Sequence, residues 1–384
     1  MYLLRGLFFV LLSFHCVQNV HAFDEFMHFK LEGRVPHLSN GYIYISYRSS
    51  SGFKKDTIEL RSRKFTYSGE ILHPTFLRIA YSATGKKEES SKWMTIYIEG
   101  GKNIVLIYKE HIKVRKSVTD REYRNYLHSV SYIENKIEFF SNDIQELRNH
   151  FESDSLKNKI QEERLTISRR VLDSLNRIKL QKEIDFISRY PKSYVSGYIL
   201  LYTMDQLSEE KLHFLYKNLG DNVKNSDPVK FVKKRIKGLV GNMAEEFEAI
   251  DSKGDRIKLN AITTKKYVLL DFWATWCIPC RADFSHLKKI YNKYSQSGFE
   301  IIGIARDDKN IEGWKAAILE DGINLWIHVL EGLEEKNLGY NYGVMPIPVK
   351  ILIDRNGIII GRWEGSSELN KKELDEMLYK IFNF

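Results

Sequence analysis

Residues 23–115 alternate between hydrophobic and polar positions, as in "GYIYISYR" and "KFTYSGEI", and they also contain the runs "FLRIAY", "MTIYIEGG" and "NIVLIYK". A period of two is typical of strands with one buried face, and the Gly/Ser clusters between these runs indicate turns. We therefore expect a small domain of the β-sandwich or barrel type over residues 23–115.

After residue 116 the hydrophobic positions recur every three or four residues, from Tyr123 through Val130 to Leu147. This period places them on one face of a long helix, and we interpret the stripe as core packing and not as a ligand-binding surface. Helical patterns continue to Pro191 and resume around Ser208 and Asp227. Residues 116–238 are therefore predicted to form a helical connector domain.

From residue 239 strand-like and helix-like segments alternate. Buried strands are expected at "YVLLDFW", "FEIIGIA", residues 326–330, "VKILID" and "IIIGRW", the last two joined by a turn at Asn356-Gly357. Helices are expected directly after the first of these strands, at residues 311–320 and at residues 369–382. This alternation predicts an α/β domain with a mixed central sheet flanked by helices over residues 239–384, so the chain is multidomain.

The first 22 residues resemble an export signal, with Arg5 before a short apolar run at residues 7–14 and Val20-His21-Ala22 as a cleavage site. We expect residues 1–22 to be removed, and Cys16 with them. A membrane anchor is the alternative, but this run is shorter than the about 20 residues needed to cross a bilayer. No transmembrane segment is expected in the mature chain.

The formal net charge of +9 is unevenly distributed, because residues 240–384 carry 19 Lys and Arg against 22 Asp and Glu. The basic excess therefore lies upstream of residue 240. One cluster comprises Lys230, Lys233, Lys234, Arg235 and Lys237. We interpret it as a solvated helix face, with contact to an acidic partner or anionic lipid as the alternative. Nucleic acid is not an expected partner for an exported protein.

Cys277 and Cys280 are the only thiols of the mature chain, and they lie where the strand "YVLLDFW" gives way to a helix. Backbone N–H groups and the helix dipole stabilise a thiolate at such a position, so Cys277 is the expected nucleophile. Cys280 follows one turn later, close enough to form a disulfide with Cys277 and to attack a mixed disulfide on it. Pro279 suits the first turn of a helix, and Ile278 adds no charge.

Other roles for this pair agree less well with the sequence. A zinc site would need a second CxxC or a spaced histidine pair, which the sequence lacks, so no metal is expected. A structural disulfide that closes so short a loop would stabilise the fold little. A peroxiredoxin would have a threonine three residues before its cysteine, where this chain has Ala274.

The stretches "LLDFWATWCIPCRADFSHLKKIY", "GFEIIGIARDD" and "YGVMPIPVKILIDRNGIII" resemble the thioredoxin fold, and in particular the exported TlpA/ResA-like disulfide reductases. Upstream, "DTIELRSRKFTYSGEI" and "IYIEGGKNIVLIY" look like the amino-terminal β domain that precedes such modules in Gram-negative anaerobes. The resemblance implies a periplasmic enzyme without a bound cofactor, or one anchored in the membrane and facing the periplasm. It also implies disulfide-bearing clients, such as apo-cytochrome c, and a membrane thiol relay as electron donor.

The resemblance further implies roles for individual residues. Cys277 would be the exposed nucleophile and Cys280 the buried resolving thiol. Pro348 would follow a cis peptide bond, with Ile347 offering its backbone to an extended client. Asp271 would be a buried carboxylate with a raised pKa that accepts the proton of Cys280.

Trp273, Trp276, Ile278 and Pro279 are expected to form the client-contacting surface around the nucleophile. Asp283 and Ser285 depart from the family pattern, which commonly has glutamate and proline at these two places. Both leave the expected fold intact, but they affect how Cys280 is tuned.

Three functions remain open from the sequence. A reductase of protein disulfides is the main prediction. An oxidant or isomerase of the same fold is the second, since the residues around the cysteines tune the reduction potential. The third is a binding or assembly protein in which residues 23–238 capture a partner.

Overall fold

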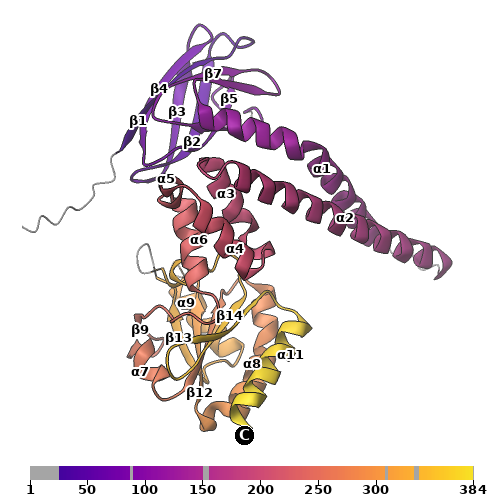
Figure 1. Cartoon of the computed structure of the whole chain (residues 1–384), viewed down its shortest axis with the longest axis vertical. Coiled ribbons are helices and arrows are strands. Elements are labelled where there is room, and N and C mark those ends of the chain that lie inside the picture. The colour runs from indigo at the N-terminus through magenta and orange to yellow at the C-terminus, as the bar shows by residue number, and fades with distance from the viewer. Residues whose placement is uncertain (1–25, 87–89, 150–154, 308–309, 333–336, 384) are drawn as a thin grey trace, which may run out of the picture. The chain divides into compact units, whose positions relative to one another are not determined.

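The structure is a computed structural model that describes residues 26–86, 90–149, 155–307, 310–332 and 337–383 (Figure 1). The predicted export signal at residues 1–22 lies outside the described residues. Contacts divide the chain into two compact units, Met1–Asp120 and Arg121–Phe384. The predicted division into three domains is not tested by this result. The helical region lies in the second unit together with residues 239–384, which we call the C-terminal module.

The first unit contains two four-stranded sheets, with strand orders β4-β1-β7-β8 and β3-β2-β5-β6. Only β1 and β7 pair in parallel; all other pairings in these two sheets are antiparallel. The strands are β1 (Met27–Arg34), β2 (Gly41–Ser49), β3 (Gly52–Leu60), β4 (Lys64–Ile71), β5 (Thr75–Ser82), β6 (Met94–Ile98), β7 (Gly101–Ile107) and β8 (Ile112–Arg115).

A shared apolar core joins the two sheets of this unit. In β1 the side chains of Phe29 and Leu31 are buried, whereas Lys30 is exposed, as the period of two predicts. Gly33 lies so close to Phe65 that a Cβ atom there would overlap the phenylalanine ring. The core takes residues from strands of both sheets, so this part of the chain is a β-sandwich, as expected.

Helices predominate among the described residues 118–149 and 155–237, as expected. They are α1 (Val118–Asn149), α2 (Ser155–Arg189), α3 (Tyr194–Thr203), the short 3₁₀ turn η2 (Met204–Gln206), α4 (Glu209–Asn218), α5 (Asp221–Lys224) and α6 (Asp227–Lys237). α1 and α2 run antiparallel (Figure 1), and Val130, Ile144 and Leu147 of the predicted stripe are buried. None of the helices in the described ranges is both long and apolar enough for a membrane crossing.

The predicted solvated face of α6 needs one correction, at Arg235. Its side chain is buried and ion-paired, with 3.2 Å between Nε and Asp205 and 2.8 Å between a terminal nitrogen and Glu364. Lys233 and Lys237 are exposed, as expected. Arg235 therefore does not belong to a solvated basic face; because a buried charge requires partners, it links α6 to a strand of the C-terminal module.

The C-terminal module is built on a five-stranded mixed sheet with the order β13-β12-β11-β14-β15. β12 pairs in parallel with both β11 and β13. β14 pairs antiparallel with β11, and β15 pairs antiparallel with β14. These strands are β11 (Tyr267–Trp273), β12 (Phe299–Ala305), β13 (Ile327–Leu330), β14 (Val349–Ile353) and β15 (Ile359–Glu364). The predicted α/β fold with a mixed sheet is confirmed.

Two apolar clusters cover the two faces of this sheet. One includes residues of α8 (Ile278–Tyr294), α9 (Ile311–Glu320) and α11 (Glu368–Phe382), and the other includes residues of α7 (Leu259–Thr263) and α10 (Leu338–Asn341). The hairpin β9 (Glu248–Ile250) and β10 (Arg256–Lys258), the 3₁₀ turn η3 (Ser295–Ser297), α7 and α10 were not predicted. They are five residues long or shorter, and such segments are too short for a period to be recognised.

Candidate active site

The two cysteines lie where β11 becomes α8. Cys277 is the N-cap residue of α8, and its sulfur accepts a hydrogen bond from the backbone N–H of Cys280 at 3.3 Å. Pro279 lies in the first turn, where its missing N–H costs no intrahelical hydrogen bond. The local sequence therefore places the sulfur of Cys277 at the positive end of a helix, where a thiolate is stabilised.

The structure joins Cys277 and Cys280 in a disulfide, with 5.3 Å between their Cα atoms. Cys280 is buried, but the expected exposure of Cys277 is not found, because this residue is only 4% exposed in the disulfide form. Its neighbours Trp276 and Ile278 are 64% and 81% exposed. An approaching client would thus meet these two side chains around a recessed disulfide.

Trp273 does not belong to this surface, contrary to the sequence-based expectation. Its side chain is fully buried, with the ring 5.2 Å from that of Phe284 and 6.0 Å from that of His328. Trp273 is the last residue of β11 and points into the core beneath α8, whereas Trp276 lies in the following loop. Trp273 can therefore support the cysteines only by packing, not by contacting a client.

The loop before β14 supplies the second side of the site. The peptide bond between Ile347 and Pro348 is cis, as expected, and the Pro348 carbonyl accepts a hydrogen bond from Gly365 at 2.9 Å. Ile347 packs against the apolar cluster that contains both cysteines. Pro346, two residues before Pro348, is exposed and lies outside the helices and strands.

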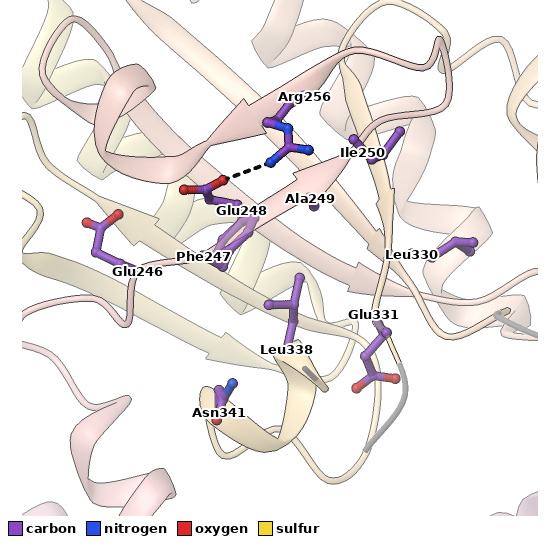
Figure 2. A pocket seen from close by; sticks show the side chains of 11 residues that line it. Glu246, Phe247, Glu248, Ala249, Ile250, Arg256, Leu330, Glu331, Leu338 and Asn341 are labelled. Atoms are coloured by element: carbon purple, nitrogen blue, oxygen red, sulfur yellow. Dashed lines mark ion pairs between the residues drawn. The ribbon is translucent and has the colours of Figure 1, made fainter. Parts of the chain in front are cut away.

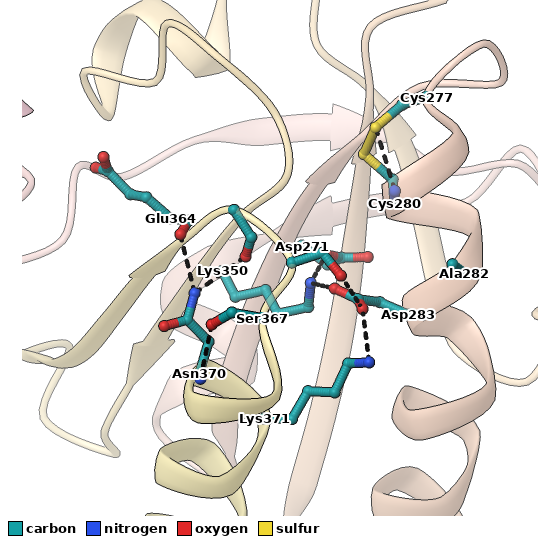
Figure 3. A network of polar contacts seen from close by, with 12 residues as sticks. Asp271, Cys277, Cys280, Ala282, Asp283, Lys350, Glu364, Ser367, Asn370 and Lys371 are labelled. Atoms are coloured by element: carbon teal, nitrogen blue, oxygen red, sulfur yellow. Dashed lines mark hydrogen bonds and ion pairs between the residues drawn. A yellow bond between two sulfur atoms is a disulfide. The ribbon is translucent and has the colours of Figure 1, made fainter. Parts of the chain in front are cut away.

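Asp271 is buried, as the resemblance implies, and it has a charged partner that was not predicted from the sequence. Lys350 of β14 is the direct cross-strand partner of Asp271, and its Nζ lies 3.6 Å from the carboxylate. The same Nζ lies 2.8 Å from Asp283 of α8 (Figure 3). A carboxylate from the neighbouring strand and a carboxylate from α8 thus both lie next to one buried ammonium group.

Asp283 has further partners on its other side. Its Oδ1 accepts a hydrogen bond from Ser366 at 2.5 Å. The same oxygen lies 3.4 Å from Nζ of Lys371 (Figure 3). The two carboxylates consequently differ in their surroundings: among the described residues, Asp271 has Lys350 as its charged partner, whereas Asp283 has two lysines and a hydroxyl group.

This difference separates the two acids electrostatically. Burial raises the pKa of Asp271; the attraction of Lys350 opposes this effect and repulsion from Asp283 adds to it. Burial would also raise the pKa of Asp283, but Lys350, Ser366 and Lys371 together outweigh it and lower that pKa. Of the two, Asp271 is therefore the group that holds a proton more readily, and Asp283 is the stable anion.

Lys350 was missed, and Asp283 was noted only as a departure from the family pattern, although both interrupt apolar patterns in the sequence. Asp283 lies three positions after Cys280 and four before Leu287, on the apolar face of α8. Lys350 interrupts the otherwise apolar strand "VKILI", all of whose residues are buried. Because a charge on a buried face requires a partner, Lys350 could have been recognised in the same way, but the sequence does not show that Asp283 and Lys350 are partners of one another.

A cavity of about 640 Å³ lies between the β9–β10 hairpin on one side and residues 330–332 and α10 on the other (Figure 2). Glu248 and Arg256, 3.5 Å apart, line one wall, and Glu331 and Leu338 line another. Neither cysteine lines it. The cavity is therefore separate from the disulfide.

Comparison with known proteins agrees with this geometry. The AhpC/TSA family matches residues 240–362. The chain is 32% identical over 151 residues to the thiol-disulfide oxidoreductase ResA of Bacillus cereus, covering 39% of this chain and 83% of the relative. It is 31% identical over 168 residues to the thiol:disulfide interchange protein DsbE of Escherichia coli, covering 43% and 83%.

Among solved structures, the thioredoxin domain of a thiol-disulfide oxidoreductase from Bacteroides vulgatus is 32% identical, with a TM-score of 0.32. That similarity covers 36% of this chain and 97% of the other. The sequence relatives show that the chain belongs to the thioredoxin-fold family of ResA- and DsbE-type thiol-disulfide oxidoreductases, and the CxxC disulfide at the start of α8 agrees with this.

Proposed function

We propose that this thiol-disulfide oxidoreductase works as a reductase of protein disulfides. The observation that carries the proposal is the Cys277–Cys280 pair at the helix start, recessed between exposed apolar side chains and next to the Ile347–Pro348 loop. Trp276, Ile278 and Pro279 would contact the client, and the backbone of Ile347 would pair with its extended chain. Trp273 has no part in this contact.

The reaction takes place in two exchange steps. The Cys277 thiolate attacks one sulfur of the client disulfide, a bond forms between Cys277 and that sulfur, and the other client sulfur leaves as a thiolate. The Cys280 thiolate then attacks the sulfur of Cys277, which re-forms the internal disulfide and releases the second client thiolate. Two electrons thereby pass from the protein dithiol to the client, and a membrane thiol relay would restore the dithiol.

Asp271 would accept the proton of Cys280 before the second step. Its burial favours the protonated form, so a proton transferred from the thiol is held without leaving a second bare charge in the interior. Asp283 and Lys350 would act as a fixed ion pair that sets the electrostatic field around this transfer.

We place the protein in the periplasm, exported by a signal at residues 1–22 that is removed. A membrane anchor facing the periplasm is the alternative, and the two are distinguished by the N-terminal sequence of the protein recovered from cells. An N-terminus at Phe23 supports export with cleavage, whereas a retained leader supports the anchor.

Trapping of clients tests the assignment of the two thiols. Cys277→Ser should abolish turnover, whereas Cys280→Ser should accumulate client proteins as mixed disulfides on Cys277, which appear on non-reducing gels and disappear on reduction. The double serine variant is the matched control. If Cys280→Ser traps no more protein than this control, the assignment is wrong.

The reduction potential tests the direction of the reaction. A value near or below about −230 mV supports a dedicated reductase, and a value above about −180 mV indicates an oxidant or isomerase. The assembly hypothesis makes a different prediction: full cellular function should remain in the double serine variant. Complementation that requires both thiols would exclude it.

A further inference from the structure

Two consecutive residues after β12 contact both loops of the active site. The N–H of Arg306, directly after β12, donates to the carbonyl of Trp273, the last residue of β11, at 3.0 Å. Successive side chains of an extended chain point in opposite directions. Arg306 and Asp307 can therefore contact different neighbours while sharing one anchored segment of backbone.

Asp307 holds the loop that leads to the cysteines. Its carboxylate accepts hydrogen bonds from the N–H of Thr275 at 2.8 Å and from the Thr275 hydroxyl at 2.7 Å. Asp307 is buried, so these charge-assisted bonds are shielded from water. Thr275 precedes Cys277 by two residues, and Asp307 thus fixes the backbone from which the N-cap of α8 begins.

Arg306 holds the loop on the other side of the site. Its guanidinium group donates to the carbonyl of Met345 at 2.9 Å and to that of Val344 at 3.2 Å. The same group forms a two-point contact with Glu331, at 2.7 and 3.0 Å. Ile347, whose backbone is proposed to pair with the client, follows Met345 by two residues.

Glu331 gives Arg306 a fixed partner. Its side chain is buried, its N–H donates to the Ala305 carbonyl at 2.8 Å, and its own carbonyl accepts from Leu338 at 2.9 Å. Gly339 leaves no room here, because a Cβ atom would overlap the Glu331 carboxylate. The guanidinium fork is thus fixed on the carboxylate while it binds two successive loop carbonyls.

We propose that Arg306 is a positioning residue for client recognition and that Asp307 is a positioning residue for the nucleophile. Arg306 fixes the orientation of the Ile347 backbone, so it acts on extended clients that pair along the loop. Asp307 fixes the start of α8, so it acts on every disulfide that Cys277 attacks. This inference rests on the proposed pairing of clients with the Ile347–Pro348 loop.

The test measures formation of the mixed disulfide by the full chain carrying Cys280→Ser, which stops after the first exchange step. Two disulfides that release the same thiopyridine are compared: dithiodipyridine, and an extended peptide whose cysteine carries thiopyridine. The reaction forms the same kind of bond and expels the same leaving group in both cases. The ratio of their rate constants therefore isolates recognition of the peptide chain.

Arg306→Gln should lower the rate constant for the peptide about tenfold, as expected when charge-assisted bonds that order the loop are lost, and change that for dithiodipyridine less than about twofold. The rate constant of Arg306→Lys for the peptide should lie between those of the unsubstituted arginine and of Arg306→Gln, because lysine keeps the charge but not the planar guanidinium fork. Asp307→Ala should slow both reagents together. Arg256→Gln removes another ion-paired arginine of the module, bound to Glu248, and should leave both rate constants unchanged.

An unchanged peptide ratio in Arg306→Gln overturns the proposal for Arg306, and so does an equal loss with both reagents, which indicates only a general structural role. A selective loss with the peptide in Asp307→Ala overturns the proposal for Asp307. Mixed-disulfide formation is common to reductases, oxidants and isomerases. A reduction potential that excludes a reductase would consequently refute the proposed direction without affecting this result.

Discussion

Lys350 is the shared cation of two buried carboxylates, and Lys350→Met tests how much that charge matters. Methionine keeps most of the apolar side chain but removes the ammonium group, which lies 2.8 Å from Asp283 and 3.6 Å from Asp271. All three residues are buried. The variant thus leaves two buried carboxyl groups without their common partner.

The expected loss follows from the geometry of this pair. Removing one partner of a buried ion pair costs about 3–5 kcal/mol, because the remaining charge is buried without compensation. We expect the free energy of unfolding of Lys350→Met to fall by an amount in that range at neutral pH. Protonation of one carboxyl group limits the loss, since the neutral acid tolerates burial better than the anion.

The pH dependence of this loss has a defined sign. In the native protein the pKa of Asp283 is lowered, so its contribution to stability is present above the ordinary aspartate value of about 3.9 and is lost as the pH falls through the lowered pKa. Without Lys350 the pKa values of both acids rise, and the folded variant loses stability as the pH increases above about 3.9. The deficit of Lys350→Met should therefore be largest at alkaline pH and should narrow toward acid pH.

The assay is urea unfolding of both proteins at about pH 5, 7 and 9, followed by tryptophan fluorescence. Five of the six tryptophans lie in residues 239–384, so the signal reports mainly on the module that contains Lys350. Lys371→Met is the matched control. Its Nζ lies 3.4 Å from Asp283, but the side chain is 26% exposed and is shared with Glu368. The free energy of unfolding of Lys371→Met should therefore fall by less than about 1 kcal/mol.

The reasoning would be refuted by equal losses in Lys350→Met and Lys371→Met at neutral pH. It would also be refuted by a deficit in Lys350→Met that does not change between acid and alkaline pH. In either case the side chain would contribute through packing and not through its charge.

Three further predictions concern the same module. Asp271→Asn should slow release of the mixed disulfide at neutral pH by removing the proton acceptor for Cys280, and an unchanged rate in stopped-flow exchange would exclude this role. Burial lowers the pKa of His328 to about 4, so the native protein should lose up to about 3 kcal/mol of stability as the pH falls from about 6.5 to 4. His328→Gln should remove this pH dependence of the urea midpoint, and an identical pH dependence in the variant would show that His328 is not its source. Trp276→Ala should reduce client trapping without lowering the melting temperature, because its side chain is 64% exposed; a lower melting temperature would place it in the core instead.

The strands of the C-terminal module could be predicted closely. "FEIIGIA" coincides with β12, "YVLLDFW" with β11, and the helix expected at residues 311–320 with α9. These elements are long relative to their periods, and buried strands between helices appear as uninterrupted apolar runs. The position of Cys277 at the start of α8 follows from the same local pattern.

Side-chain burial near the ends of elements could not be predicted in the same way. Trp273 and Trp276 are the same type of residue and lie three positions apart, yet Trp273 is fully buried and Trp276 is 64% exposed. The difference arises because β11 ends at Trp273 while α8 packs over it, and only the following loop turns outward. Arg235 is a similar case, since its burial depends on Asp205 and Glu364, which are distant in sequence.

The sequence by itself determined the fold class of the module and the position of Cys277 at the start of α8, because both follow from local periodicity and residue type. The burial of Asp271 was implied by the resemblance to thioredoxin-like proteins. Only the tertiary structure decided which charges share the interior behind the disulfide. Asp283 and Lys350 are 67 positions apart, and they meet because β14 pairs antiparallel with β11 while α8 packs across both strands. Local patterns do not encode such a pairing, since a buried charge specifies that a partner must exist but not which residue supplies it.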